Sequence, residues 1–131
     1  LVPVQPGSPA EGAVVRPFII AAVSLEPRGD QLVLTAEDGR KLEINLYGDC
    51  CSQTFFDDDA KMDVADCVGH TLLSIVEAGE LPGRVEYPAS DVEAYYSLHI
   101  MTVRADFHIP FRNDSNGYYG GNAEWDRDWN K

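Results

Sequence analysis

The sequence predicts a mainly β fold, built as an antiparallel bent sheet or a small barrel with one or two short helices. Segments 31–36 and 41–47 alternate apolar and polar residues, as half-buried strands do. A longer run rich in Tyr, Leu, Ile and Val covers 93–104. Because 131 residues is the size of one domain, we expect a single β-rich domain over 13–131, preceded by a Pro-rich arm at 1–12.

The first half of the domain predicts an antiparallel meander of three strands. Segment 13–25 is rich in Val, Ile and Phe, and the turn residues Pro27 to Asp30 follow it. The strand at 31–36 is then joined to the strand at 41–47 by Asp38-Gly39, a typical tight-hairpin pair.

The middle of the chain is less regular. We expect a short helix or an irregular crossing over 48–60 and a helical turn at 64–68, ended by Gly69. An apolar strand is expected over 70–77, and the Pro- and Gly-containing segment 79–90 predicts a loop.

The C-terminal part predicts a second β-pair. The longest β-like run should turn at Ala105-Asp106 and return as 107–111. Because Pro110 has no backbone N–H, we expect the return strand to lie at an edge or to be bulged. Segment 113–121 is rich in turn residues, and 123–129 is expected to form a last strand.

The net charge limits the possible partners. With 10 Lys and Arg against 22 Asp and Glu, the net charge is −12, which argues against direct nucleic-acid binding and against anionic membranes. No stretch approaches the length of a transmembrane helix, and the start of the chain lacks the features of a signal peptide. The negative charge is compatible with a role in solubility alone, with calcium binding, or with binding to a basic protein surface.

Two short motifs carry a resemblance to a known family. Gly48-Asp49-Cys50-Cys51-Ser52 and Ser115-Asn116-Gly117-Tyr118-Tyr119 resemble elements of small uncharacterised proteins found mainly in bacteriophage and bacterial genomes. The acidic-Gly hairpin at Asp38-Gly39, the acidic stretch Asp57 to Asp59 and the Gly-anchored segment 69–77 extend the similarity, which covers roughly 15–124. The resemblance implies a phage or prophage setting, in the host cytoplasm or the virion, and no known activity.

The chain departs from the family's pattern at two places. Ala94-Tyr95-Tyr96 stands where the family usually has a Trp-bearing strand. Cys67 falls where the family has an aliphatic residue, which argues against a ligand role for this thiol.

The cysteines do not predict a disulfide framework or a cofactor site. Three cysteines and no secretion signal favour a reducing compartment. Cys50 and Cys51 are adjacent, so in a strand they would point to opposite faces. A zinc site that recruits Cys67 and His70, or a catalytic thiol, remains an alternative to simple packing. We assign no metal and no cofactor, and leave Asp49-Cys50-Cys51 as a motif of unknown role.

The remaining ionisable residues have structural interpretations. Asp57 to Asp59, with Asp63 and Asp66, lack a calcium-loop pattern and are read as a solvated acidic loop or as a charged face for a basic partner. His70, His99 and His108 form no catalytic or metal spacing and are read as strand residues.

The most plausible functional surface is the aromatic turn. Asn116-Gly117 suits a tight turn, which would present Tyr118 and Tyr119 for recognition. We therefore expect a non-enzymatic phage-type accessory protein that binds another protein, either as a host-protein inhibitor or decoy, or as a structural or decoration component of the virion.

Two rival functions stay open. A nucleotide-signal binder would need cationic groups, which Arg104 and Arg112 could supply from either side of the last long turn. An enzyme would need Cys50 or Cys51 to meet a histidine in space.

Overall fold

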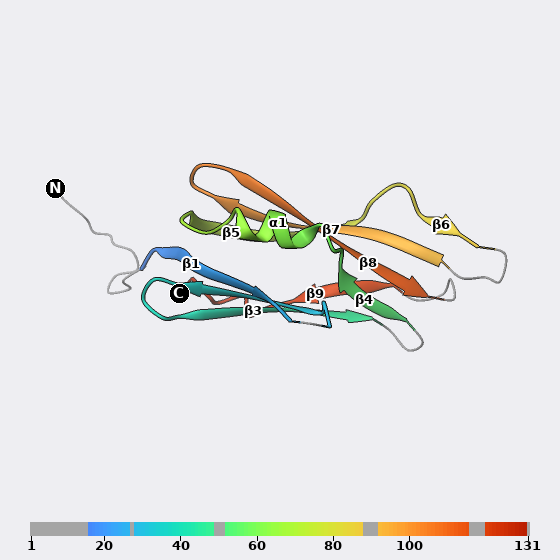
Figure 1. The fold of residues 1–131 in the computed structure, drawn as a ribbon, viewed down its shortest axis with the longest axis horizontal. Coiled ribbons are helices and arrows are strands. Elements are labelled where there is room, and N and C mark those ends of the chain that lie inside the picture. The colour runs from blue at the N-terminus through green and yellow to red at the C-terminus, as the bar shows by residue number, and fades with distance from the viewer. Residues whose placement is uncertain (1–15, 27, 49–51, 88–91, 116–119, 131) are drawn as a thin grey trace.

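The strands follow the alternation of the sequence in the computed structural model, which describes residues 16–26, 28–48, 52–87, 92–115 and 120–130. In these ranges nine strands form one antiparallel sheet of order β4-β8-β7-β5-β1-β2-β3-β9, with β6 paired to β7 (Figure 1). The elements are β1 Phe18–Leu25, β2 Gln31–Ala36, β3 Lys41–Gly48, β4 Gln53–Phe56, α1 Ala60–Ala65, β5 Thr71–Glu80, β6 Val85–Glu86, β7 Val92–Thr102, β8 Asp106–Ser115 and β9 Gly121–Glu124. A mainly β fold with a short helix is confirmed.

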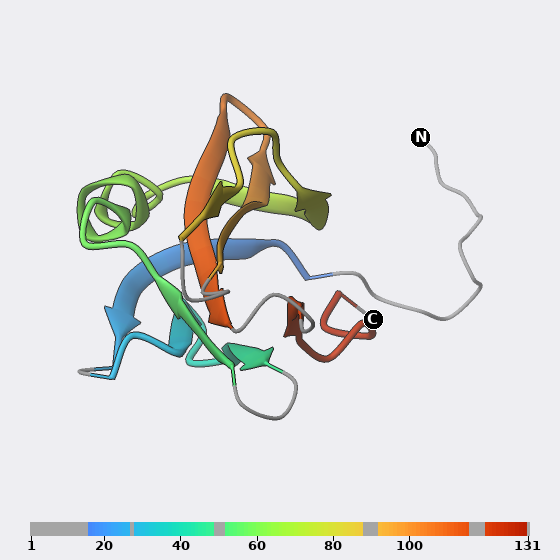
Figure 2. The same cartoon turned by 90° about the vertical axis from the view of Figure 1, so that its right-hand side faces the viewer.

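The sheet bends back on itself about β1. Phe18 and Ile19 pair with β5, whereas the rest of β1 pairs with β2, and the register shifts between Ile20 and Ala22. Such a bulge bends a strand and increases its twist. As a result β4, at one end of the sheet, approaches β3 and β9 at the other, as the view along the long axis shows (Figure 2).

The core fills the inside of this bend. Every second residue of β2, β3, β7 and β8 points inward, as strand geometry requires. The largest aliphatic and aromatic side chains with under 2% of their surface exposed are Ile20, Leu32, Leu34, Ile44, Val64, Leu98, Ile100, Ile109 and Phe111. Burying each of these apolar side chains contributes about 1.5–3 kcal/mol.

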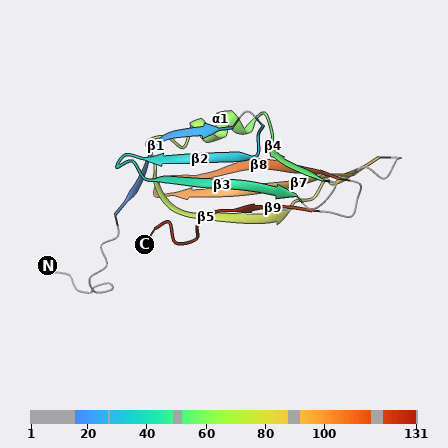
Figure 3. The same cartoon turned by 90° about the horizontal axis from the view of Figure 1, so that it is seen from below.

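The predicted meander is confirmed, and its turns hold the expected residues. β2 and β3 lie side by side in register from Gln31–Asn45 to Thr35–Lys41 (Figure 3). Gly39 has a φ of +92°, a conformation in which glycine carries no steric cost. The Asp38-Gly39 hairpin therefore forms where the sequence predicts it.

The segment after β3 was predicted incorrectly. Gln53–Phe56 is a strand rather than a helix or irregular crossing, because it pairs with Phe111 to Asp114 of β8. The helix covers Ala60–Ala65, earlier than the expected turn at 64–68, and buries Ala60 and Val64.

Other boundaries shift by a few residues. β5 continues to Glu80, and the expected loop at 79–90 contains the two-residue strand β6. β8 extends to Ser115, and the last strand is the shorter Gly121–Glu124. In the described ranges, no helix has the length and apolar character needed to span a bilayer.

The expectation that the strand containing Pro110 is an edge strand or is bulged is wrong, although Pro110 itself lies past the end of the β4 pairing. β8 lies between β4 and β7, and its register with β7 is unbroken from Val92–Ser115 to Met101–Asp106. The Pro110 carbonyl accepts a hydrogen bond of 3.2 Å from the Asp57 N–H, just beyond the end of β4. Since a strand residue directs its N–H and C=O to the same side, the missing N–H of Pro110 falls where the β4 ladder has ended.

Candidate functional site

Residues that flank the two motifs singled out in the sequence, 48–52 and 115–119, meet at one end of the bent sheet. Gly48, which begins the first motif, pairs with Gly121, which follows the second. Thr54 of β4 packs on this glycine pair and pairs with Asn113 of β8, two residues before Ser115. We call this region, defined by Gly48, Thr54, Asn113 and Gly121, the motif end; β4 and β9, which contribute to it, are labelled side by side in Figure 1.

The two glycines allow the ends of the sheet to approach. A β-carbon on Gly121 would lie 2.7 Å from Thr54 Cγ2, and one on Gly48 would lie 2.8 Å from Thr54 Oγ1. Real β-carbons essentially never come so close to another heavy atom. Glycine is therefore required at both positions by packing.

A buried polar pair lies directly below the glycines. Asn113 is fully buried, and its Nδ2 donates a hydrogen bond of 2.8 Å to Thr54 Oγ1. The Asn113 Oδ1 atom has no hydrogen-bond partner among the described residues. On the same side, the Gly121 N–H donates to the Tyr96 hydroxyl at 3.3 Å. Burying a polar side chain lowers stability unless it is hydrogen-bonded. The hydrogen bond to Thr54 therefore favours the one position of the Asn113 side chain in which its amide nitrogen is paired.

The outer face of the motif end carries a cluster of ionisable side chains around Arg112. Arg112 lies 3.4 Å from Asp114 and 4.0 Å from Glu93, and its guanidinium carbon lies 4.8 Å from the centre of the Phe55 ring. The Tyr95 hydroxyl donates to Glu93 Oε1 at 2.8 Å. Arg112 is thus engaged by two carboxylates and an aromatic ring.

The pKa shifts in this cluster follow from these contacts. Hydrogen bonds from Tyr95 and Tyr87 lower the pKa of Glu93, and the same bonds raise the pKa of both tyrosines. Burial raises the pKa of Asp114 despite its arginine neighbour.

The structure separates Arg104 from Arg112. Arg104 is exposed in the turn between β7 and β8, whereas Arg112 lies near the opposite end of that hairpin. Eight residues of extended chain span roughly 25 Å, so the two cannot line one small pocket. Of the other predicted residues, Asn116, Gly117, Tyr118 and Tyr119 lie outside the described part of the chain. The same holds for Asp49, Cys50 and Cys51.

An open groove runs along the seam where β4 approaches β3. It has a volume of about 450 Å³, and its walls include Arg28, Tyr47 and Phe55. The Tyr47 side chain is 53% exposed. Tyr47 and Arg28 are not among the site residues predicted from the sequence, although Tyr47 follows the inward-facing Leu46 and therefore points outward.

His99 and His108 lie in strands, His99 partly buried and His108 exposed, whereas His70 lies just before β5 and Cys67 is in the core. The rings of His99 and His108 stack with centroids 4.0 Å apart, and His70 Nδ1 lies 3.2 Å from Thr102 Oγ1. Cys67 is fully buried, and burial raises the pKa of its thiol to about 12. Within the described ranges, no three His, Cys, Asp or Glu side chains are grouped to hold a metal ion.

The acidic residues before and after α1 form an exposed face. Asp58, Asp59 and Asp66 are exposed, while Asp57 is partly buried and has a pKa raised by that burial. Lys61 is the cation that the sequence supplies within this segment. The face is therefore strongly negative and adjoins the Arg112 cluster through Asp57.

Comparison with known proteins identifies one family. A family model described as a domain of unknown function, DUF7448, matches residues 14–125. Searches of curated proteins and of solved structures gave no significant match.

Proposed function

Since the chain belongs to the DUF7448 family, whose function is unknown, we propose an activity from the site itself: a non-enzymatic protein that binds another protein through its motif end. The observation that carries the proposal is the meeting of the flanks of both family motifs at Gly48 and Gly121. One recognition surface there would use both motifs, including the aromatic turn at Tyr118-Tyr119.

The surroundings of the motif end suit a protein partner with a basic surface. Tyr47 and Tyr87 are 53% and 45% exposed, and carboxylates such as Asp30 and Glu93 lie beside them. Exposed aromatic side chains bury much area at low entropic cost, and the carboxylates attract cationic groups. The engagement of Arg112 by Glu93 and Asp114 leaves it poorly placed for a phosphate.

The proposal includes a phage or prophage setting for the protein. The partner would be a host protein that the chain inhibits as a decoy, or a virion protein beside which it assembles. Either partner places the protein in the host cytoplasm or the virion. The net charge of −12 is consistent with the mimicry of a nucleic acid's charge.

A capture experiment with matched variants tests the proposal. Tagged full-length protein would be incubated with lysate of infected bacteria and the retained proteins identified by mass spectrometry. Tyr47→Ser/Tyr87→Ser changes the motif end, and Leu73→Ser/Val103→Ser changes equally exposed residues at the other end. We expect a stoichiometric partner that the tyrosine variant loses and the control variant keeps. Loss with the control alone, or no partner at all, would contradict the proposal.

A second candidate function is the binding of a small anionic aromatic ligand, such as a nucleotide signal. The groove lined by Arg28, Tyr47 and Phe55 favours it, since it combines an exposed cation with aromatic walls. Calorimetric titration with a panel of nucleotides tests this function. Binding that Arg28→Gln weakens at least tenfold would support it, and absence of heat for every nucleotide would exclude this class of ligand.

A further inference from the structure

A second groove lies beside the start of β1, away from the motif end. It has a volume of about 560 Å³, and its aromatic lining residues are the partly exposed Trp129 and the largely buried Phe18 and Trp125. The rings of Phe18 and Trp129 meet edge to face with centroids 5.7 Å apart. Glu124 and Asp128 add negative charge at its walls. Both tryptophans of the sequence therefore lie in this one groove.

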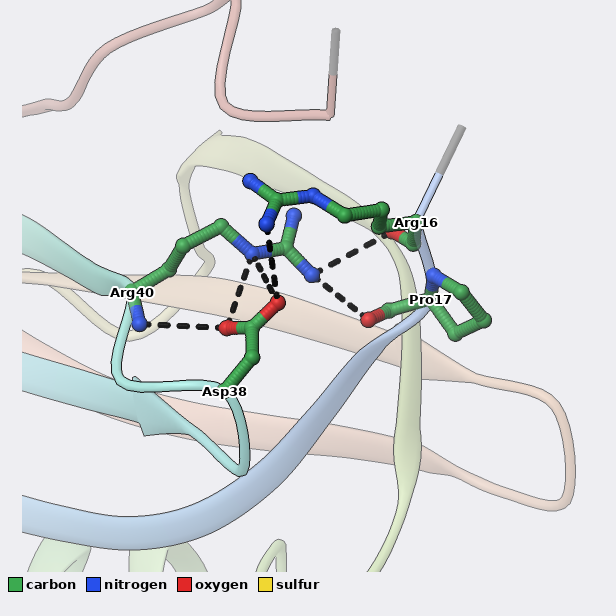
Figure 4. Close-up of polar contacts among 4 residues, drawn as sticks. All are labelled: Arg16, Pro17, Asp38 and Arg40. Atoms are coloured by element: carbon green, nitrogen blue, oxygen red, sulfur yellow. Dashed lines mark hydrogen bonds and ion pairs between the residues drawn. The ribbon is translucent and has the colours of Figure 1, made fainter. Parts of the chain in front are cut away.

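The chain enters the sheet at the rim of this groove. Arg40 Nη2 donates hydrogen bonds to the Pro17 carbonyl at 2.6 Å and the Arg16 carbonyl at 3.3 Å (Figure 4). Asp38 holds the same guanidinium through Nε at 2.8 Å. The guanidinium carbon also lies 5.3 Å from the centre of the Phe18 ring. Arg40 thus fixes the point at which the segment before Arg16 leaves the sheet.

That N-terminal segment has a spacing that suits an aromatic groove. Pro3, Pro6 and Pro9 recur at every third position. A polyproline II helix has three residues per turn, so these prolines would form one continuous apolar face. Grooves lined by aromatic side chains bind such faces in many recognition domains, because the extended conformation is already favoured before binding.

We propose that the groove at Phe18, Trp125 and Trp129 binds the chain's own segment 3–9 as a polyproline II helix. The six residues 10–15 connect this segment to the rim and span at most roughly 20 Å, enough to reverse direction at Gly12. So short a connection gives the segment an effective concentration on the order of millimolar, which favours binding within one molecule. The arm is then a built-in ligand of the fold.

Tryptophan fluorescence of the full chain tests the proposal, because both tryptophans line the groove and Trp129 is partly exposed in it. The variant Pro3→Ala/Pro6→Ala/Pro9→Ala should shift the emission to longer wavelength and raise acrylamide quenching at least twofold, while circular dichroism stays unchanged. The matched control Gln5→Ala/Ser8→Ala changes arm residues off the proline face and should behave as wild type. A synthetic peptide of residues 1–10, added to the proline variant, should restore the wild-type emission.

Several results would overturn the proposal. Equal emission and quenching in the proline variant and wild type would show that segment 3–9 does not occupy the groove. An effect that depends on protein concentration between about 0.1 and 100 μM would assign the groove to the arm of a second copy instead. Equal effects of the control and proline variants would exclude recognition of the proline face.

Discussion

Thr54 packs against Gly121 so closely that the two ends of the sheet can meet only because residue 121 has no side chain. We predict that Gly121→Ala lowers the free energy of unfolding by about 1–3 kcal/mol, because a methyl group must push Thr54 or the strand away. Urea denaturation measures the loss.

A double-mutant cycle separates this contact from other effects of the substitution. Thr54→Ala removes the atoms nearest to residue 121, so it should recover part of the loss in the Gly121→Ala background. Gly120→Ala is the control for general glycine effects, because a β-carbon there would approach only the Tyr96 hydroxyl, at 3.3 Å. Strict additivity of Gly121→Ala and Thr54→Ala would contradict the proposed contact.

The Asp38–Arg40 pair predicts a loss of stability in acid. Hydrogen bonds from Arg40 lower the pKa of Asp38 below its ordinary value of 3.8. A depressed carboxyl pKa adds stability above the unfolded value, and this contribution is lost as the pH falls through the folded pKa. Urea unfolding between pH 2 and 6 should therefore show wild type above Asp38→Asn at pH 5, with the curves converging toward pH 2. A constant difference would refute the linkage.

Asp114 is expected to affect the pH dependence of stability in the opposite direction to Asp38. Burial raises its pKa, so the charged form is penalised in the folded protein above the folded pKa, and the penalty disappears below the unfolded value of 3.8. Asp114→Asn should therefore be more stable than wild type at pH 7 and equal to it at pH 3. Asp106→Asn, an exposed change on the same strand, serves as the comparison. Lower stability of Asp114→Asn at pH 7 would show that its ion pair with Arg112 outweighs burial.

Cys67 is predicted to be chemically silent in the folded protein. It is fully buried, and burial, with the charges of Asp66 and Asp63, raises its pKa to about 12. In a Cys50→Ser/Cys51→Ser background, a thiol reagent at pH 8 should label Cys67 only after denaturant is added. Rapid labelling without denaturant would show that α1 opens readily.

The local parts of the fold could be predicted from the sequence, and the non-local parts could not. Apolar and polar residues alternate in β2 and β3 on either side of Asp38-Gly39. Their hairpin could therefore be predicted from this segment alone. β4 has four residues and depends on β8 for its pairing, and neither fact is visible in Gln53–Phe56. The end of β8 was missed because the buried Asn113 breaks the apolar alternation, and only its bond to Thr54 explains its burial.

The candidate site shows the same limit. The two short motifs stand out in the sequence, but the approach of their flanking residues depends on the pairing of Gly48 with Gly121, 73 positions apart by their numbers. Arg104 and Arg112 are near in sequence and far apart in space, because a straight hairpin separates residues in proportion to their distance from the turn.

Pro110 has a consequence for how the protein behaves at high concentration. Past the end of β4, the flank of β8 has backbone groups directed outward, which is the kind of template on which a foreign strand can grow. Pro110 removes one donor from that template, and α1 lies against the same strand. Although β4 is short, the part of β8 beyond it therefore lacks the full set of backbone hydrogen-bonding groups on which a strand of another chain could assemble.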